Sequence, residues 1–288
     1  MARERIRWLA VVDRAREIVE SYEGGVTLRQ VMYRLASEGV LPHTPPMYRR
    51  LSSQLAKARR EGRFPDLIDT IRAVHVAPAW PHVDAFVREM PDWFQLDRTE
   101  GQEHALYVAA EKDTLRQLLT DWLAEYGIPV LVVRGFGSQS YVDVVRDRTA
   151  GDAREAHLLY VGDFDCSGED VERDWVERTR CWSRVQRVLL TYEQALDEYE
   201  LPATEGKRHD PRWPAFARRY GFDIERPVQW EVEALEPDEL QHLVLTAVEP
   251  YVDRQVLAEQ IAREDEQRHT LEEFLGGWDV TDNGEGVT

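Results

Sequence analysis

The chain has 288 residues, of which 43% are hydrophobic and 31% are charged, and this length allows two ordinary domains with a substantial core. Its two cysteines, Cys166 and Cys181, exclude a disulfide framework and a zinc site built from clustered Cys and His pairs. The charged N-terminus does not resemble a signal peptide and no long uncharged apolar run follows, so we expect a cytoplasmic protein that does not contact a membrane.

The net charge of −18 is unevenly distributed along the chain. Residues 1–75 carry fourteen Lys or Arg against nine Asp or Glu, a balance of +5, and the remaining residues carry −23. A basic segment joined to an acidic body suggests a module that faces phosphates and a body that can hold a metal ion. An ordinary solvated surface is the alternative interpretation.

Residues 1–76 predict a basic module of three short helices, at 5–22, 27–39 and 46–62. Thr27 and Gln30 have the spacing of a capping box at the start of the second helix. A helix-turn-helix or winged-helix unit fits this pattern, and a helical bundle that does not touch DNA is the alternative. The residues expected to contact DNA lie on the third helix: Arg49, Arg50, Lys57, Arg59 and Arg60.

Tyr33 lies away from the apolar stripe of the second helix. At about 100° per residue it falls roughly 150° from the centre of that stripe, on the face that carries Arg29 and Gln30. We expect an exposed phenol beside a guanidinium, which could attack a phosphodiester with the cation stabilising the phenolate. The tyrosine could equally contact DNA or pack against a second domain.

Residues 77–103 are predicted to be a linker, because prolines and aromatic residues alternate there with polar runs. One short helix is expected at 83–89. Its neighbours Trp80, Trp93 and Phe94 are expected to pack against a domain rather than to stack on bases.

Residues 104–235 predict an α/β domain, because strands and helices alternate in the pattern of a parallel sheet. Polar residues follow three of the strands: Glu111 the first, the turn 135–138 the second, and Asp163 with Asp165 the third. Ligands of such sheets bind at the carboxyl ends of the strands. The expected strands are 105–110, 129–133, 158–161 and 185–190. The expected helices are 114–126, a second that ends near 146, a third that starts at Ser167, and a fourth at 193–199. Asp170 is the expected capping partner of Ser167.

One glutamate and an Asp-x-Asp pair at the same edge predict a hard cation, Mg²⁺ or Mn²⁺, held by oxygen ligands. The glycine turn lacks the third glycine of a dinucleotide-binding fingerprint, because position 140 is Ser. The chain also has no phosphate-loop Gly-Lys-Ser/Thr and no His-Glu-x-x-His. What is left indicates phosphoryl transfer, in which a metal ion clamps non-bridging oxygens and a carboxylate handles protons.

The segment after the fourth strand adds a possible further carboxylate. An edge strand is expected at 228–232. Glu231 and Glu233 share one face, so either could add a carboxylate to the metal site, and Glu233 is the preferred candidate. A helix is expected at 213–220 and two more in 236–276, with a flexible acidic tail at 277–288.

Three motifs of this domain resemble those of a Toprim domain, found in topoisomerases, primases and some nucleases. They are Ala110-Glu111-Lys112, Gly135-Phe136-Gly137-Ser138 and Asp163-Phe164-Asp165-Cys166-Ser167-Gly168. The run Leu28-Arg29-Gln30-Val31-Met32-Tyr33 resembles the active-site segment of the topoisomerase VI A subunit and its meiotic double-strand-break relatives. Glu231-Val232-Glu233-Ala234-Leu235 is similar to the segment that follows the Toprim domain there, so the resemblance spans about residues 25–250.

The resemblance implies a role for each motif residue. Glu111 would be the general acid or base and a metal-linked glutamate, and Asp163 and Asp165 would be Mg²⁺ ligands. Tyr33 would form a transient 5′-phosphotyrosyl bond, supported by Arg29. The family acts as a homodimer in which the tyrosine of one chain meets the Toprim site of the other, and a separate ATPase subunit is a possible partner.

The predicted function is therefore Mg²⁺-dependent cleavage of DNA strands through Tyr33. Nicking or cutting by metal-only hydrolysis, with Tyr33 a bystander, is the first alternative. A DNA-binding protein whose Toprim domain is non-catalytic or regulatory is the second. A nucleotidyl transferase would need a nucleotide pocket and usually a zinc element, and neither is visible in the sequence.

Overall fold

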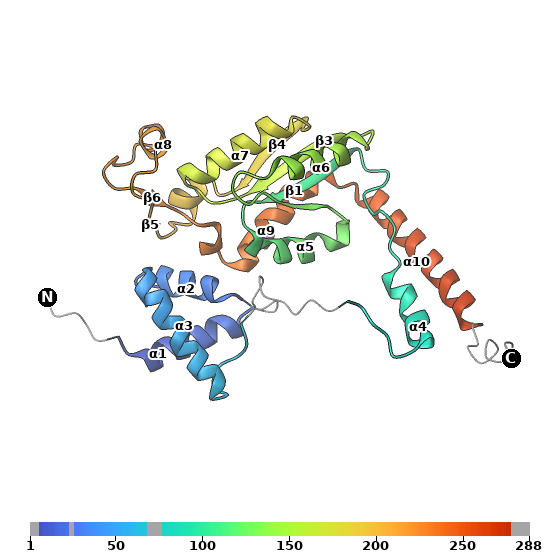
Figure 1. The fold of residues 1–288 in the computed structure, drawn as a ribbon, viewed down its shortest axis with the longest axis horizontal. Helices are drawn as coiled ribbons and strands as arrows, with labels where there is room; N and C mark the ends of the chain where they lie inside the picture. Colours follow the sequence, from blue (N-terminus) through green and yellow to red (C-terminus); the bar gives the residue numbers. More distant parts are fainter. Residues whose placement is uncertain (1–5, 23–25, 68–76, 278–288) are drawn as a thin grey trace.

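A four-stranded parallel sheet organises the body of this computed structural model, which describes residues 6–22, 26–67 and 77–277 (Figure 1). The strands lie in the order β2-β1-β3-β4, and each hydrogen-bonds its neighbour in parallel. The predicted α/β class and its four strands are confirmed. The strands are β1 (His104–Ala110), β2 (Val130–Val132), β3 (Glu155–Val161) and β4 (Arg184–Leu189).

Helices cover both faces of the sheet. Successive side chains of a strand point to opposite faces, so each central strand contributes residues to two hydrophobic cores. Along β1, Leu106 and Val108 pack with helices α5 (Arg116–Leu123) and α9 (Pro237–Val248). Tyr107 instead packs on the side of α6 (Gln139–Ala150) and α7 (Cys166–Thr179), with its ring edge-on to Trp182. The two central strands, β1 and β3, are therefore buried on both faces, whereas β4 at the edge of the sheet is only partly buried.

The N-terminal module consists of α1 (Trp8–Glu20), α2 (Leu28–Ser37) and α3 (Pro45–Arg60) around their own apolar core. The predicted capping box is present: Thr27 Oγ1 accepts a hydrogen bond from the Gln30 N–H at 3.2 Å, and Gln30 Oε1 accepts one from the Thr27 N–H at 2.8 Å. The described part of the module contributes no strand to either sheet, so the β-hairpin wing of a winged-helix unit is not seen there. DNA binding by the module stays a prediction.

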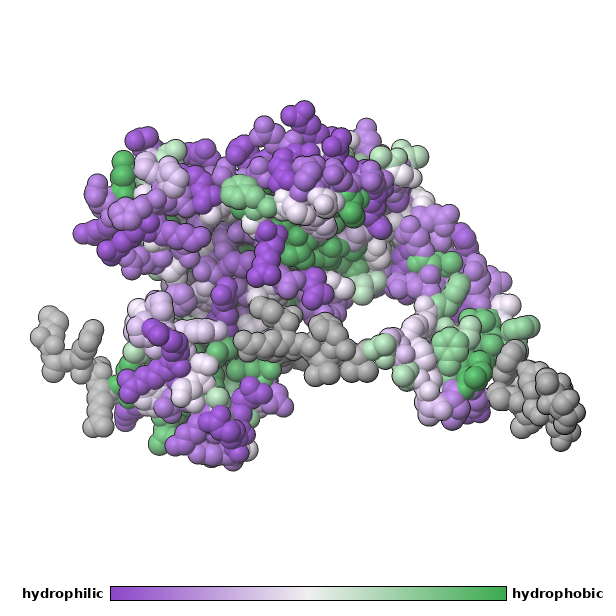
Figure 2. Space-filling model, in the orientation of Figure 1, coloured by the Kyte–Doolittle hydropathy of each residue, from purple (hydrophilic) through white to green (hydrophobic). Residues whose placement is uncertain are grey.

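Residues 77–103 contain a longer helix than predicted, α4 (Val83–Trp93), which lies beside α10 (Arg254–Gly276) in a projecting arm (Figure 1). The Trp80 ring packs on the rings of Phe86 and Trp93, at 4.7 and 5.3 Å between centroids, rather than in a domain core. Figure 2 shows apolar residues gathered on this arm.

A buried carboxylate joins the arm to the segment that precedes the sheet. Glu264 of α10 is fully buried and accepts hydrogen bonds from Arg98 at 2.8 Å, Arg268 at 2.7 Å and the Leu96 N–H at 3.0 Å. Its hydrogen bond with Arg98, together with those from Arg268 and Leu96, lowers the pKa of Glu264 to about 2. The acid therefore stays ionised and holds residues 96–98 against α10.

Three predicted boundaries were wrong. Helix α7 begins at Cys166, and its cap is Asp165 rather than Asp170. The predicted helix 193–199 is a single π-turn at Gln194–Glu198. The predicted edge strand 228–232 is shortened to β6 (Val228–Gln229), which pairs antiparallel with β5 (Thr204–Glu205). It stops there because Trp230 forms a bridge with Phe164 and the Val232 N–H bonds to Asp163.

The helix predicted to end near residue 146 continues to Ala150 as α6, and the other predicted helices were found close to their expected bounds. The region 114–126 contains the 3₁₀ turns η1 (Asp113–Leu115) and η2 (Ala124–Tyr126) around α5, and helix α8 is Trp213–Tyr220. In the described ranges, no helix is long and apolar enough to cross a membrane. The predicted flexible tail falls almost entirely on residues 278–288, outside the described part of the chain.

The capping box yields a prediction with a built-in control. Thr27→Ala removes a side-chain cap and should lower the free energy of unfolding by about 1 kcal/mol. Thr44 is the N-cap of α3, but its side chain makes no capping hydrogen bond, so Thr44→Ala should change stability much less. Urea denaturation of the three proteins measures the difference, and equal effects of both substitutions would contradict the argument.

Glu264 yields a prediction about acid sensitivity. A carboxylate whose pKa is lowered by folding stabilises the protein above its ordinary pKa of 4.5, and this stability is lost as the pH falls toward 2. Glu264→Gln should cost about 3 kcal/mol at neutral pH and should remove this pH dependence. Hydrogen exchange of the α4 and α10 amides from about pH 6 to about pH 3 measures it. The exposed Glu266→Gln serves as the control, and an unchanged pH profile in Glu264→Gln would contradict the assignment.

Candidate active site at the carboxyl edge of the sheet

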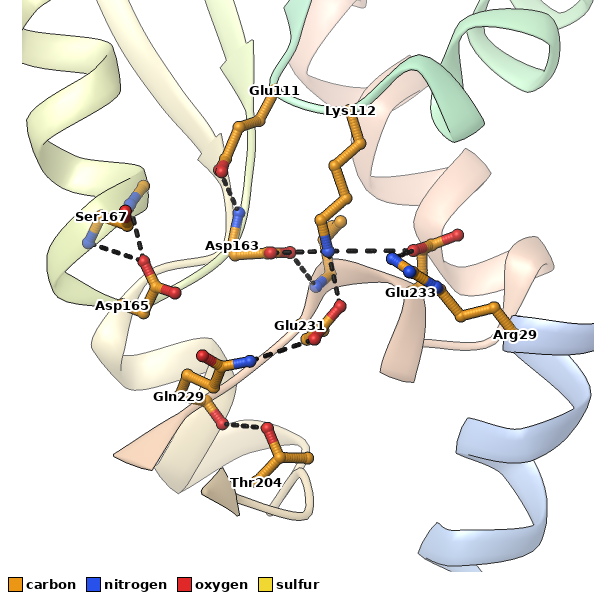
Figure 3. A network of polar contacts seen from close by, with 12 residues as sticks. Arg29, Glu111, Lys112, Asp163, Asp165, Ser167, Thr204, Gln229, Glu231 and Glu233 are labelled. Carbon is orange, nitrogen blue, oxygen red and sulfur yellow. Dashed lines mark hydrogen bonds and ion pairs between the residues drawn. The ribbon is translucent and has the colours of Figure 1, made fainter. Parts of the chain in front are cut away.

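The predicted acids Glu111, Asp163 and Asp165 lie at the carboxyl ends of β1 and β3, and Figure 3 shows Asp163 beside the ammonium group of Lys112. Glu111 follows the last residue of β1, and its Oε2 accepts a hydrogen bond from the Asp163 N–H at 3.0 Å. Asp163 follows the end of β3 by two residues. Parallel pairing in register brings the two strand ends together, as the sequence predicted.

Two glycines let Glu111 approach the loop after β3. A Cβ at Gly162 would lie 2.7 Å from Glu111 Oε2, and a Cβ at Gly168 would lie 2.9 Å from the same oxygen and 2.5 Å from the Asp163 carbonyl oxygen. A Cβ atom does not tolerate such distances, so Gly162 before the third motif and Gly168 at its end are needed for this close packing.

Lys112 lies at the centre of the cluster. Its Nζ is 2.6 Å from Asp163 Oδ2, 2.5 Å from Glu231 Oε2 and 3.8 Å from Glu233 Oε2. The other oxygen of Asp163 accepts a hydrogen bond from the Val232 N–H at 2.9 Å. Burial works against the ammonium, but the three acids outweigh it and raise the pKa of Lys112. Lys112 therefore stays protonated and provides the positive charge among these carboxylates.

The sequence does not predict the role of Lys112, and it favours Glu233 over Glu231. A lysine beside a predicted metal site carries the wrong charge for a ligand, so sequence reasoning assigns it no role there. Its signal was its position directly after Glu111, at the same strand end. Glu231 is also held by Gln229 Nε2 at 3.1 Å, so it belongs to the cluster at least as firmly as the predicted Glu233.

The acids of the cluster have perturbed proton affinities. Burial raises the pKa of Asp163 to about 8, against the lowering effect of Lys112, and the Glu111 and Glu231 carboxylates raise it further. Burial likewise raises the pKa values of Glu111 and Glu233. For Glu231, burial is outweighed by Lys112, and its pKa is lowered. The edge therefore favours additional protons or cations.

Asp165 reaches the predicted edge but not the same ligand shell. Its Oδ1 caps α7 by accepting hydrogen bonds from the Ser167 N–H at 2.8 Å and the Gly168 N–H at 2.6 Å. The predicted ligands Glu111, Asp163 and Asp165 are thus neighbours, but their oxygens do not converge on one point. Oxygen donors of the kind that Mg²⁺ prefers are present. The Lys112 ammonium lies between the carboxylates of Asp163 and Glu231.

Tyr33 is buried, with 2% of its surface exposed, and the expectation of an exposed phenol was wrong. It does lie off the apolar core of its module, as helical periodicity predicted. The 3₁₀ turn η4 (Val232–Ala234) of the body packs against α2 and covers that face. The Tyr33 ring stacks on His43 at 4.6 Å, and burial together with the Glu231 carboxylate raises the pKa of the phenol.

Two arginines of α2 connect the module to the body. Arg29 Nη1 lies 3.8 Å from Glu233 Oε2, as Figure 3 shows, and Arg34 forms an ion pair with Glu236. Burial works against the Arg29 cation, but Glu233, Tyr33 and Glu231 raise its pKa. The predicted pair of Arg29 and Tyr33 therefore faces the carboxylate cluster of its own chain.

The five basic residues of α3 that were expected to contact DNA are all exposed. Arg59 pairs with Asp66 at 2.8 Å, and the Arg50 guanidinium lies over the Trp8 ring at 5.4 Å. The other three are Arg49, Lys57 and Arg60. Their accessibility is compatible with phosphate contacts, and DNA binding stays a prediction.

A second group of side chains could hold a metal ion. It lies at the N-terminal ends of β1 and β3, opposite the carboxylate cluster. His104, Glu155 and His157 each offer a ligand atom, and these atoms lie within 4.8 Å of one another. This group was not predicted from the sequence. Its signal was the alternation Glu155-x-His157 on one face of a strand, which becomes informative only once the neighbouring strand and its register are known.

No family model and no curated protein matches the chain. The fold and the site define an α/β protein with a buried carboxylate cluster at the carboxyl edge of a parallel sheet. The resemblance to Toprim domains and to the topoisomerase VI A subunit rests on the sequence motifs.

The position of Lys112 yields a prediction about cation binding. Lys112→Met should lower the free energy of unfolding by about 3 kcal/mol, because buried acids lose their partner. It should also raise the affinity for Mg²⁺ by more than about tenfold, because the competing charge is gone. Calorimetric titration and thermal unfolding with and without Mg²⁺ measure both effects, with the exposed Lys57→Met as control. Unchanged or weaker Mg²⁺ binding in Lys112→Met would contradict this role.

Proposed function

We propose that the chain is an Mg²⁺-dependent enzyme that cleaves DNA strands. The observation that carries the proposal is the buried cluster of Glu111, Asp163, Glu231 and Glu233 at the carboxyl edge of the sheet, with Tyr33 held against it. Buried acids with raised pKa values are typical of sites that bind cations and transfer protons. The Toprim-like motifs and the exposed basic helix α3 support DNA as the substrate.

The cluster offers carboxylate oxygens, which are the type of ligand that a hard divalent cation prefers. Asp163 and Glu231 would hold Mg²⁺ or Mn²⁺ in place of the Lys112 ammonium, and the oxygen of Asp165 that does not cap α7 is available nearby. The ion would supply stabilisation of negative charge on the phosphate oxygens. Lys112 would then be free to hydrogen-bond a non-bridging oxygen of the substrate.

The chain's own residues can carry out the proton transfers. In transesterification, the Tyr33 oxygen forms a bond to the phosphorus while the bond from phosphorus to the 3′ oxygen breaks. The phenol proton passes to the neighbouring Glu231, and Glu111, whose pKa is raised, can donate a proton to the leaving 3′ oxygen. Arg29 would stabilise the phenolate and the phosphorane charge.

The buried position of Tyr33 adds a requirement to this mechanism. The phenol can reach a phosphodiester only when α2 separates from η4, or when DNA enters between them. A homodimer in which Tyr33 of one chain faces the carboxylates of the other would meet the same requirement. A separate ATPase subunit would be one means of driving such a movement.

One observation favours a second candidate function. Lys112 pairs with Asp163 and Glu231 within hydrogen-bonding distance, and such a paired cluster is also what a non-catalytic site requires for stability. A DNA-binding protein with a regulatory Toprim-like domain would therefore use α3 for binding and the cluster for structure.

Cleavage of supercoiled plasmid separates these functions. With Mg²⁺ or Mn²⁺, the wild type should convert plasmid to nicked or linear DNA, and denaturation should reveal protein attached to 5′ ends. Asp163→Asn should reduce cleavage by about a hundredfold or more. Tyr33→Phe should abolish both cleavage and the covalent adduct. Asp121→Asn and Tyr107→Phe, which lies on the face of the sheet covered by α6 and α7, are the matched controls.

The outcomes discriminate between the mechanisms. If Tyr33→Phe cleaves as the wild type does while Asp163→Asn does not, the reaction is metal-dependent hydrolysis. If the wild type binds plasmid without cleaving it, and charge reversal at Arg49 and Arg50 abolishes binding, the non-catalytic function holds. If neither Tyr33→Phe nor Asp163→Asn alters cleavage, the cluster is not the active site.

A further inference from the structure

The starts of β1 and β3 bring two imidazoles and a carboxylate to one face of the sheet. His104 is paired in register with Glu155, and His157 follows Glu155 by two residues on the same strand. Residues two apart on a strand point to the same face. All three therefore lie on the face covered by α9, at the opposite end of the strands from Asp163.

The two imidazoles are tightly packed. Their rings stack with centroids 4.2 Å apart and an interplanar angle of 22°, and the Tyr251 ring packs edge-on against His157 at 5.4 Å. The His157 side chain is only 9% exposed. Packing of this kind fixes the directions in which the ring nitrogens point.

The hydrogen-bonding capacity of this pair is unmet among the described residues. Nδ1 of His104 and Nδ1 of His157 are both buried, and neither has a hydrogen-bond partner there. Leaving a buried polar group without a partner costs about 1–3 kcal/mol. The Glu155 carboxylate lies at the other ring nitrogen of His157, 3.8 Å from Nε2. One ligand atom from each of His104, Glu155 and His157 lies within 4.8 Å of the others, so the three side chains can share one ligand.

The chemistry of the donors selects the class of ligand. Imidazole nitrogens with one carboxylate suit borderline transition metals such as Zn²⁺, whereas the oxygen donors at the other edge suit Mg²⁺. Three protein ligands leave one coordination position for water or a small anion. The histidines line a cavity of about 810 Å³, to which Arg184, Thr191 and Asp253 also contribute.

We propose that His104, Glu155 and His157 form a binding site for one transition-metal ion of the Zn²⁺ class. The ion bridges the first residues of β1 and β3 and stabilises the sheet at the edge remote from the carboxylate cluster. Its remaining coordination position faces the cavity, where water or a small anionic ligand binds. This site does not depend on the proposed DNA cleavage.

The test uses the full chain after removal of metals by dialysis against a chelator. Calorimetric titration should give one Zn²⁺ per chain, and Co²⁺ should develop the visible absorption of a low-symmetry nitrogen and oxygen site. Zn²⁺ should raise the unfolding temperature. His104→Gln and His157→Gln should each weaken Zn²⁺ binding by more than about tenfold, and Glu155→Gln should weaken it as well.

Two variants serve as controls. His269 lies 3.5 and 3.4 Å from the carboxylates of Glu272 and Glu273, but all three are exposed on a single helix, so His269→Gln should bind Zn²⁺ as the wild type does. Asp163→Asn should also leave Zn²⁺ binding unchanged, which separates this site from the carboxylate cluster. Excess Mg²⁺ should not displace the ion.

The proposal is overturned if the wild type binds no stoichiometric Zn²⁺, or if binding survives His104→Gln. It is also overturned if Asp163→Asn or His269→Gln abolishes the binding. Should His157→Gln fail to fold by circular dichroism, His104→Gln and Glu155→Gln, at more exposed positions, decide the question.

Discussion

The ammonium group of Lys112 joins segments that lie far apart in the sequence. It pairs with Asp163 after β3 and with Glu231 before η4, and it lies near Glu233 within η4. Acids buried so close together repel one another, and removing their shared cation leaves uncompensated charge at a cost of several kcal/mol. This one cation therefore stabilises the approach of the loop after β3 to η4 at the carboxyl ends of the strands.

The same cluster determines how the N-terminal module lies on the body. Arg29 reaches Glu233, and Tyr33 lies against Glu231, so the two predicted catalytic residues of α2 become part of the interface. The positive charge of Arg29 on α2 and the negative charge of Glu233 on η4 attract each other across this contact. Any reaction at Tyr33 must compete with that contact, which links the movement of the module to the chemistry proposed for the site.

The two ends of one sheet present different donors. At the carboxyl end, strands are followed by loops whose backbone N–H groups and glycines can hold several carboxylates close together. At the opposite end, the side chains belong to the strands themselves, and pairing in register brings histidines into contact. Oxygen-rich and nitrogen-rich sites can therefore coexist in one small domain without sharing a ligand.

Local patterns in the sequence were sufficient for the elements and for part of the site. Apolar runs and turn residues predicted four parallel strands, the spacing of Thr27 and Gln30 predicted the capping box, and the carboxyl-end rule brought Glu111 and Asp163 together. These features depend on residues near one another in the chain or on rules common to parallel sheets. The burial of Tyr33, the central place of Lys112 and the stacking of His104 on His157 were decided only by the tertiary structure. Each depends on which distant segment covers a side chain, and hydrophobic periodicity carries no information about that.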